Sequence, residues 1–194
     1  MNQKKFKSLS LIDLIIPEIE NRVLSILKDI LLIFSFSFLT GISAQLKIEI
    51  GIVPITMQTF IVLLSGALLG SKRGTFSQVV YLIFGLTLIP WFSRGGGIFY
   101  LFSPTFGYLI GFIFCSYTVG FLFERGFDKN IITSIFAMLI GNITIYIPGI
   151  LWLSKFIGFE NALKVGFYPF IIGDLLKIFL AGLIFQFAFK LVKK

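Results

Sequence analysis

Long apolar runs alternate with short polar clusters along most of the chain. Six runs can be read, with the approximate bounds 30–45, 53–70, 75–92, 104–123, 131–153 and 167–192. Most of them approach the roughly 20 residues that a helix needs to cross a bilayer. The second run opens with Pro54, which suits the first turn of a helix. The pattern predicts an all-α integral membrane protein with six transmembrane helices.

A weaker, two-sided pattern covers residues 9–28, ahead of the first run. Its apolar positions are Leu9, Ile12, Ile16, Ile19 and Val23, set against Asp13, Glu20 and Arg22. We expect an interfacial helix that leads into the first span; a longer first helix with a frayed start explains the pattern equally well. The predicted organisation is a cytoplasmic or interfacial segment, 1–28, followed by a six-helix membrane domain, 29–194. Because the basic N-terminus lacks an uninterrupted apolar region and a cleavage site, we expect it to stay attached.

The composition agrees with the bilayer as solvent. The 194 residues are 57% hydrophobic and 13% charged, with 25 Phe and a mean hydropathy of +0.97. Soluble domains carry about 25% charged residues. One aqueous core cannot hide this many apolar side chains, so we expect a multi-pass protein of the cell membrane.

The basic residues predict the orientation. Most of them fall in alternate connections: Lys4, Lys5, Lys7, Arg22, Lys28, Lys72, Arg73, Arg125, Lys129, Lys190, Lys193 and Lys194. The opposite connections carry only Lys47, Arg94, Lys155 and Lys164. By the positive-inside rule both termini are cytoplasmic. The net charge of +8 therefore reflects topology, since no basic stripe suits a nucleic acid.

Several chemistries are excluded by what the sequence lacks. It has no His and one cysteine, Cys115, so neither an intrachain disulfide nor a His- or thiolate-based metal site can form. No phosphate-binding loop and no catalytic triad pattern occurs. We therefore expect no enzymatic activity, no cofactor and no metal. If the chain transports a solute, either a partner hydrolyses ATP or transport is passive.

The last run contains the segment GDLLK, with Asp174 and Lys177 three residues apart. On a helix entering from the outer face, Asp174 lies about 10 Å deep and Lys177 one turn deeper on the same side. An ionisable group at that depth costs a few kcal/mol, so it usually faces the interior, is paired and serves a function. A structural lock between helices, or a snorkelling lysine, is the alternative. The pair predicts a site for a polar ligand.

Other polar residues fall near the same level. Thr56 and Gln58 open the second run, and Asn142 and Tyr146 lie one turn apart in the fifth. The long outer connections 93–108 and 154–169 add aromatic residues and a glycine triplet. Few convergent polar groups among aromatic walls are typical of a small-molecule pocket. Asn142 alone would suit an interhelical hydrogen bond.

The first run carries small residues four apart. Ser37 and Gly41, and Thr40 and Ala44, could let a partner helix approach closely. Ordinary packing within the chain explains the same spacing.

Three segments carry a resemblance to a known family. VPITMQTFIVLLSGALLGSKRGTF, SPTFGYLIGF and GDLLK, in this order and with the GGG triplet between the first two, resemble the BioY family. The resemblance runs from about residue 50 to residue 180. It implies an S-component-like helix bundle that captures biotin near the outer face for an energy-coupling-factor importer. It also implies two kinds of partner, a transmembrane coupling protein and two ATP-binding-cassette ATPases.

The resemblance also implies site residues. The family's signature positions correspond to Gln58, Gly95, Gly96, Gly97, Tyr108, Tyr146, Asp174 and Lys177. We expect Asp174 to accept from a ureido N–H of biotin, and Lys177 to meet the ureido oxygen or the carboxylate. Arg94 is the other cation at the expected mouth, and Trp91, Phe99 and Tyr100 are candidates for packing on the ring. The family's Ala-x-x-x-Ala docking pattern is only approximated by Ser37 and Gly41.

Three other functions fit parts of the pattern. An S component for another small vitamin would use the same fold. An intramembrane enzyme could use Asp174 and Lys177 for proton transfer. A scaffold protein could use them as a lock.

Overall fold

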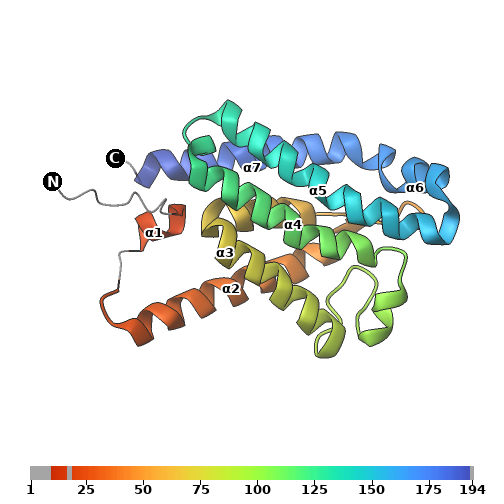
Figure 1. Ribbon diagram of the computed structural model, residues 1–194, viewed down its shortest axis with the longest axis horizontal. Helices are drawn as coiled ribbons and strands as arrows, with labels where there is room; N and C mark the ends of the chain where they lie inside the picture. Colours follow the sequence, from red (N-terminus) through yellow and green to blue (C-terminus); the bar gives the residue numbers. More distant parts are fainter. Residues whose placement is uncertain (1–9, 17–18, 193–194) are drawn as a thin grey trace.

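The computed structural model describes residues 10–16 and 19–192 and is a helix bundle (Figure 1). Its α-helices are α1 Leu11–Ile15, α2 Arg22–Gln45, α3 Gln58–Thr87, α4 Phe106–Leu122, α5 Ile131–Ile157, α6 Phe159–Gly166 and α7 Ile171–Val192. The shorter elements are the strands β1 Lys47–Ile48 and β2 Ile55–Thr56, the 3-10 helices η1 Ile98–Phe102 and η3 Tyr168–Phe170, and the π-helical turn η2 Phe123–Phe127. The two-residue strands pair antiparallel, and an isolated antiparallel bridge joins Phe92 and Gly95; both depart from the expected all-α fold.

The element α3 is a helical hairpin. Gly70, with φ 81° and ψ 176°, interrupts the helix in a conformation that favours glycine. Its two halves, 58–69 and 71–87, run antiparallel, because Gln58 bonds Tyr81 and Gln78 bonds Ser65 across them. Two of the expected runs, 53–70 and 75–92, are therefore helical only over 58–69 and 71–87, and these halves join without a loop. The expectation that Pro54 lies in the first turn of a helix is wrong, because Pro54 directly precedes β2 and the helix begins at Gln58.

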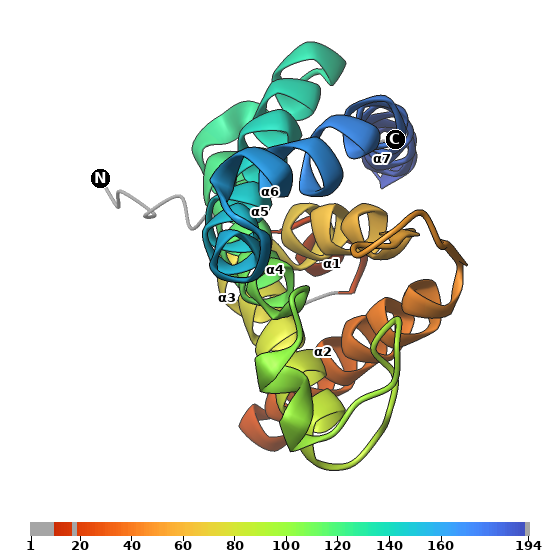
Figure 2. The same cartoon turned by 90° about the vertical axis from the view of Figure 1, so that its right-hand side faces the viewer.

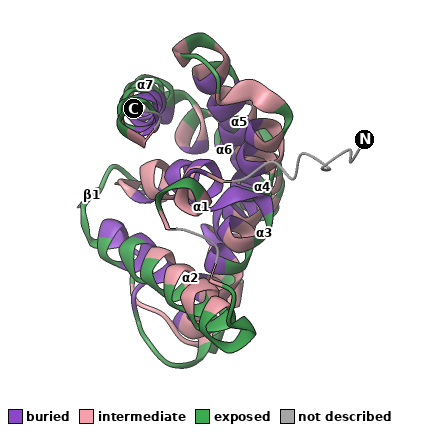
Figure 3. Ribbon diagram, turned by 90° about the vertical axis from the view of Figure 1, so that its left-hand side faces the viewer, coloured by how far each residue is buried: buried purple, intermediate pink, exposed green. Residues whose placement is uncertain are grey.

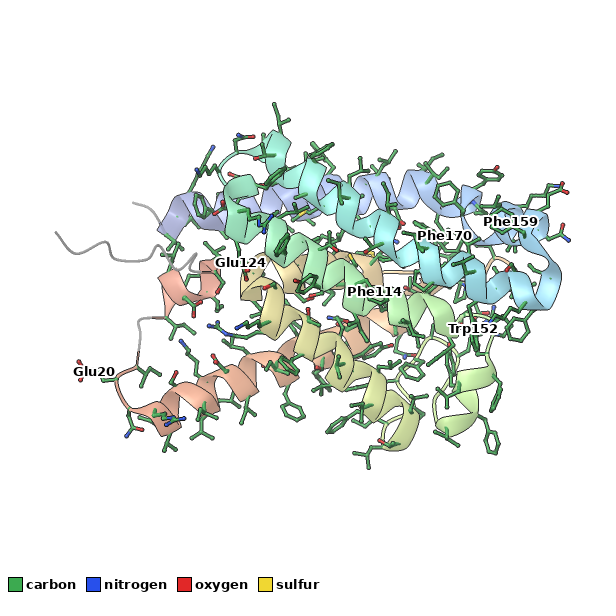
Figure 4. The ribbon with its side chains drawn as sticks, in the orientation of Figure 1. Glu20, Phe114, Glu124, Trp152, Phe159 and Phe170 are labelled. Atoms are coloured by element: carbon green, nitrogen blue, oxygen red, sulfur yellow. The ribbon has the colours of Figure 1, made fainter. Side chains whose placement is uncertain are left out.

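A carboxylate from another helix caps the N-terminus of the second half of the hairpin. Glu124 accepts from the Ser71 backbone N–H at 2.7 Å and from the Ser71 hydroxyl at 2.9 Å. A negative charge at a helix N-terminus interacts favourably with the unpaired N–H groups and the helix dipole. Glu124 lies beside α1 at one end of the bundle, far from Trp152 at the opposite end (Figure 4).

Four helical stretches in the described part of the chain are long and apolar enough to cross a membrane. They are Arg22–Gln45, Phe106–Phe127, Ile131–Ile157 and Phe159–Val192. The half-helix 58–69 spans only about 18 Å at 1.5 Å per residue. The structure thus gives a helical membrane protein with at least these four candidate spans, while the number six stays a prediction.

The segment 9–28 is not one helix. Ile16, which precedes a proline in the sequence, is extended (φ −108°, ψ 107°), as residues before proline tend to be. Asn21 then caps α2 by accepting from the N–H groups of Val23 and Leu24. Because α2 already begins at Arg22, the longer first helix describes this region better than an interfacial helix. Residues 9, 17 and 18 lie outside the described residues, as do Lys4, Lys5, Lys7, Lys193 and Lys194.

The connections alternate between the two ends of the bundle. We call the end with α1, the Gly70 reversal, η2 and the last turn of α7 the basic end. The opposite end, with β1–β2, the connection 88–105 and α6, is the loop end (Figure 1). This alternation is what the order of apolar runs predicts.

Helices pack closely through glycine. A Cβ on Gly66 would lie 2.4 Å from the Ser116 carbonyl oxygen, and one on Gly120 would lie 2.3 Å from the Ser71 nitrogen, so α3 and α4 touch backbone to backbone. α4 lies between α3 and α5, whereas α2 packs at the edge, mainly against α3 (Figure 2). Accordingly, α4 is largely buried and α2 mostly exposed (Figure 3).

Candidate functional site

Asp174 and Lys177 form a buried ion pair in the first turns of α7. The Lys177 Nζ lies 3.1 Å from the Asp174 Oδ1, and both residues are buried. The i, i+3 spacing places the two side chains on one face of the helix. Asp174 in the first turn also interacts favourably with the helix dipole. The predicted pair and its inward direction are therefore present in the structure.

The Asp174 carboxylate accepts four hydrogen bonds from three helices. Its Oδ2 accepts from Asn142 Nδ2 at 3.0 Å and from the Tyr146 hydroxyl at 2.5 Å, both on α5. Its Oδ1 accepts from Lys177 Nζ at 3.1 Å and, more weakly, from the Thr59 hydroxyl of α3 at 3.5 Å. Two acceptances by each oxygen use the full capacity of the carboxylate. The charge is compensated in the way that a buried ion pair requires.

We call Thr59, Asn142, Tyr146, Asp174 and Lys177 the charged cluster. The sequence predicts the convergence of Asn142 and Tyr146 on the pair, and the structure brings these residues together. The sequence pattern does not single out Thr59, which directly follows Gln58 in the segment PITMQTF. A threonine hydroxyl in a span carries no signal of its own, because most bond their own helix.

A cavity adjoins the charged cluster at the loop end. The space that the centre of a water-sized sphere can occupy is about 50 Å³, within about 510 Å³ of empty space that includes open solvent. Its polar wall is formed by Thr56, Gln58, Thr59, Ser93, Thr105, Tyr108, Tyr146 and Lys177, and its apolar and aromatic wall by Val53, Pro54, Tyr100, Leu109, Phe112, Ile145 and Phe170. Phe170 contributes from the turn that leads into α7 (Figure 4). Polar groups that converge among apolar and aromatic side chains are typical of a small-molecule site.

The cavity wall includes Lys177 and Tyr146 but neither Asp174 nor Asn142. Those two residues lie behind the wall and hold the residues in front of them. The buried Oδ1 of Asn142 has no hydrogen-bond partner among the described residues. Direct contact of Asp174 with a ligand, as expected from the sequence, would require one of its four donors to be displaced.

Gln58 and Tyr108 reach the cavity as predicted. Gln58 accepts from Thr56 Oγ1 at 3.0 Å and donates to the Tyr81 hydroxyl at 2.7 Å, so its amide is held in one orientation. The Tyr108 hydroxyl donates to the Gly166 carbonyl oxygen at 2.9 Å. A Cβ on Gly149 would lie 2.5 Å from the Tyr108 ring, so the ring fits only against glycine.

Arg94 does not reach the cavity wall. Its guanidinium donates to the carbonyl oxygens of Gly51 at 2.7 Å and Ile52 at 2.8 Å, and to Glu49 at 3.0 Å. Lys47 also bonds Glu49 and reaches the Ser93 carbonyl oxygen. These bonds tie the connections 46–57 and 88–97 together over the loop end. Hydrogen bonds from Lys47 and Arg94 hold the pKa of the exposed Glu49 carboxyl below its usual value.

The glycine triplet has a structural position. The Gly97 N–H donates to the Gly85 carbonyl oxygen at 2.8 Å, and a Cβ on Gly96 would lie 2.6 Å from the Pro90 Cα. Gly95 and Gly97 adopt positive φ values of 107° and 89°. These glycines fold the connection onto the end of α3, and none of them lines the cavity.

Of the aromatic candidates, only Tyr100 lines the cavity. Trp91 is buried elsewhere, where it donates to the Tyr81 carbonyl oxygen at 2.9 Å and stacks on the Tyr81 ring. Phe99 is 83% exposed. The expected contacts of Trp91 and Phe99 with a ligand ring are therefore not supported by this arrangement.

The small residues of α2 lie inside the chain. Ser37, Thr40, Gly41 and Ala44 are all buried. Ser37 donates to the Ser77 carbonyl oxygen at 2.6 Å, and a Cβ on Gly41 would lie 2.7 Å from the Trp91 ring. They serve packing within the chain, so the expectation that they are free to dock a partner is wrong for this conformation.

Comparison with known proteins gives consistent matches. The family model described as "BioY family" matches residues 10–194. A relative from Pyrococcus horikoshii called "Probable biotin transporter BioY" is 38% identical over 151 residues, 77% of this chain and 89% of the relative. The "Biotin transporter BioY" of Thermotoga maritima is 35% identical over 151 residues, 77% of this chain and 88% of the relative.

A solved structure is similar along nearly the whole length. It is described as the crystal structure of the S-component for biotin from an ECF-type ABC transporter, and it superposes with a TM-score of 0.78 at 27% identity. The match covers 91% of this chain and 96% of the solved one.

Proposed function

The chain belongs to the BioY family, and on that premise we propose that it is a biotin-binding S component of an energy-coupling-factor importer. The observation that carries the proposal is the cavity at the loop end, whose polar wall contains Lys177 backed by the saturated Asp174 carboxylate. Biotin matches this wall chemically. Its ureido and carboxylate oxygens suit the Lys177 ammonium, and its thiophane ring and aliphatic chain suit the apolar side.

Within this proposal, Lys177 is the contact and Asp174 is its counter-ion. We do not assign Asp174 a direct hydrogen bond to the ligand, because its oxygens already accept from four donors. Gln58, Tyr108 and Tyr146 complete the polar contacts from the other helices.

In the membrane, we propose six crossings with both termini in the cytoplasm. The 12-residue and 17-residue halves of the α3 hairpin supply the second and third crossings. The basic end then faces the cytoplasm and the loop end faces outward, which opens the cavity to the outside.

The same proposal assigns the energy source to partners. The chain itself is a transport subunit without enzymatic activity, cofactor or metal. A transmembrane coupling protein and two ATP-binding-cassette ATPases drive import.

A biotin titration of the detergent-purified chain tests the proposal. Trp91 and Trp152 report binding by fluorescence, since Trp152 bonds Ser103 two residues from the cavity wall. We expect saturable binding of biotin and none of unrelated vitamins. Saturable binding of a different vitamin, without binding of biotin, would show that the substrate is that vitamin. No binding by any of them, with a stable fold, would favour a structural lock.

A further inference from the structure

The Lys177 ammonium has two protein partners in the described chain. It donates to Asp174 Oδ1 at 3.1 Å and to Thr59 Oγ1 at 3.0 Å. An ammonium group carries three N–H donors. Two bonds and the Cε–Nζ bond fix the tetrahedral nitrogen, so they also fix the direction of the third N–H. Because Lys177 lines the cavity, we take this third donor as the one that a ligand can accept from.

Thr59 differs from the other partners of the ion pair because it bonds both charged groups, whereas Asn142 and Tyr146 bond Asp174. It comes from α3, while Lys177 and Asp174 come from α7, and it lines the cavity itself. Its hydroxyl oxygen accepts a hydrogen bond from Lys177, and its single proton is donated toward Asp174. The donor and acceptor roles of the hydroxyl are therefore both defined. Thr59 is only half-buried, which places its hydroxyl at the boundary between the charged cluster and the cavity.

We propose that Thr59 is a positioning residue for ligand binding, whose hydroxyl orients the Lys177 ammonium toward an oxygen of the ligand. The inference rests on the proposed function, because it takes Lys177 as the ligand contact. Without the hydroxyl, the ammonium keeps its counter-ion but loses the second anchor, and its free N–H groups can turn away from the cavity.

The first test is a pair of substitutions measured by biotin titration. T59V keeps the branched shape and removes the hydroxyl, whereas T59S keeps the hydroxyl and removes the methyl group. We expect T59V to weaken biotin binding about tenfold or more, the loss of one hydrogen bond to a charged group, and T59S to stay within about threefold. T87V is the matched control, since the Thr87 hydroxyl is exposed and bonds its own helix at Ile83; we expect no change.

A double-mutant cycle separates positioning from a purely structural role. If Thr59 acts through Lys177, T59V costs little additional affinity in a K177M background, about twofold or less. The same factor in both backgrounds would overturn the inference, as would wild-type affinity in T59V or an equal loss in T59S. Thermal unfolding of each variant in detergent checks that it is folded.

The titrations distinguish a failure of the Thr59 inference from a failure of the proposed function. Biotin binding by the wild type with an unchanged T59V contradicts the Thr59 inference alone. A wild type without saturable biotin binding contradicts the proposed function, and the inference with it.

Discussion

Two buried polar clusters hold the helices together, and they differ in charge and in what they adjoin. The charged cluster joins α3, α5 and α7 and lies against the cavity. A second group, which we call the neutral cluster, joins α2, α3 and α4 and consists of Ser37, Thr40, Ser65, Ser77, Gln78 and Ser116, all fully buried. None of its members lines the cavity at the loop end.

The neutral cluster bonds mostly within itself and to nearby backbone. Several of its hydroxyls bond carbonyl oxygens of their own helices, as Thr40 does to Phe36 and Ser65 does to Val62, and Gln78 Nε2 links the helices. The buried Gln78 Oε1 has no hydrogen-bond partner among the described residues. Such interhelical hydrogen bonds are worth about 0.6 kcal/mol on average. The comparison teaches that buried polarity alone does not mark a binding site in a membrane bundle. In the proposed function, the ion pair next to a cavity is the feature that distinguishes the binding site.

Removing one charge from the charged cluster should have the largest effect. Asp174→Asn leaves Lys177 buried without its counter-ion, and breaking a buried pair costs about 3–5 kcal/mol. We expect a loss of thermal stability in detergent together with a drop in biotin affinity of about 100-fold or more.

The double variant D174N/K177M turns the charged cluster into a neutral one. It should regain much of the stability, because no unpaired charge remains, but not the affinity. Recovery of both would show that the pair is a lock rather than a binding device.

Crowding the cavity wall should have the next largest effect. Gly149→Ala forces the Tyr108 ring to move, since its Cβ would lie 2.5 Å from the ring. Overpacking of this kind costs about 1–3 kcal/mol, so we expect biotin affinity to fall about tenfold in the titration. Gly173→Ala is the control, because nothing lies within 4 Å of the added Cβ although Asp174 is its neighbour. An equal loss in both variants would contradict the cavity assignment.

Loosening the loop end should change kinetics more than affinity. Arg94→Ala removes the bonds to Glu49, Gly51 and Ile52, and we expect faster biotin dissociation in stopped-flow fluorescence with an affinity change of about threefold. A large affinity loss in R94A would instead place Arg94 at the ligand.

The Glu49 carboxyl should make stability depend on pH. Its pKa is lowered in the folded protein, so its contribution to folding stability is present above the ordinary carboxyl range and is lost as the pH falls through the folded-state pKa. The thermal stability of Glu49→Gln should therefore differ from that of the wild type at neutral pH and converge with it in acid.

The neutral cluster should tolerate change. Gln78→Met removes the amide and keeps the approximate volume, so we expect a stability change of about 1 kcal/mol and biotin affinity within about twofold. A tenfold loss of affinity would mean that the two clusters are coupled, which we do not expect because no hydrogen bond joins them among the described residues.

The sequence predicts the charged cluster better than the loops. Asp174 and Lys177 stand out because charges are rare in spans, and Asn142 and Tyr146 share a helical face with each other. Thr59 could not be found in this way, since its contact with Lys177 depends on how α3 and α7 are rotated against each other. The same holds for Asp174, whose saturation by four donors is visible only when three helices are in place.

The remaining differences also have physical causes. Small residues four apart favour close packing without specifying the partner, so Ser37 and Gly41 fit α3 as well as they would fit another protein. Gly70 ends one helix and starts the next within a single residue, which a hydropathy pattern does not separate from a longer loop. The side chain of Arg94 meets loop carbonyls whose positions the sequence does not specify.

The most direct test is a structure of the chain with biotin bound. We predict that biotin lies in the cavity at the loop end, with one of its oxygens about 2.7–3.1 Å from the Lys177 Nζ. The ion pair between Asp174 and Lys177 should remain in place. Biotin bound elsewhere, or held in the cavity without a contact to Lys177, would contradict this prediction.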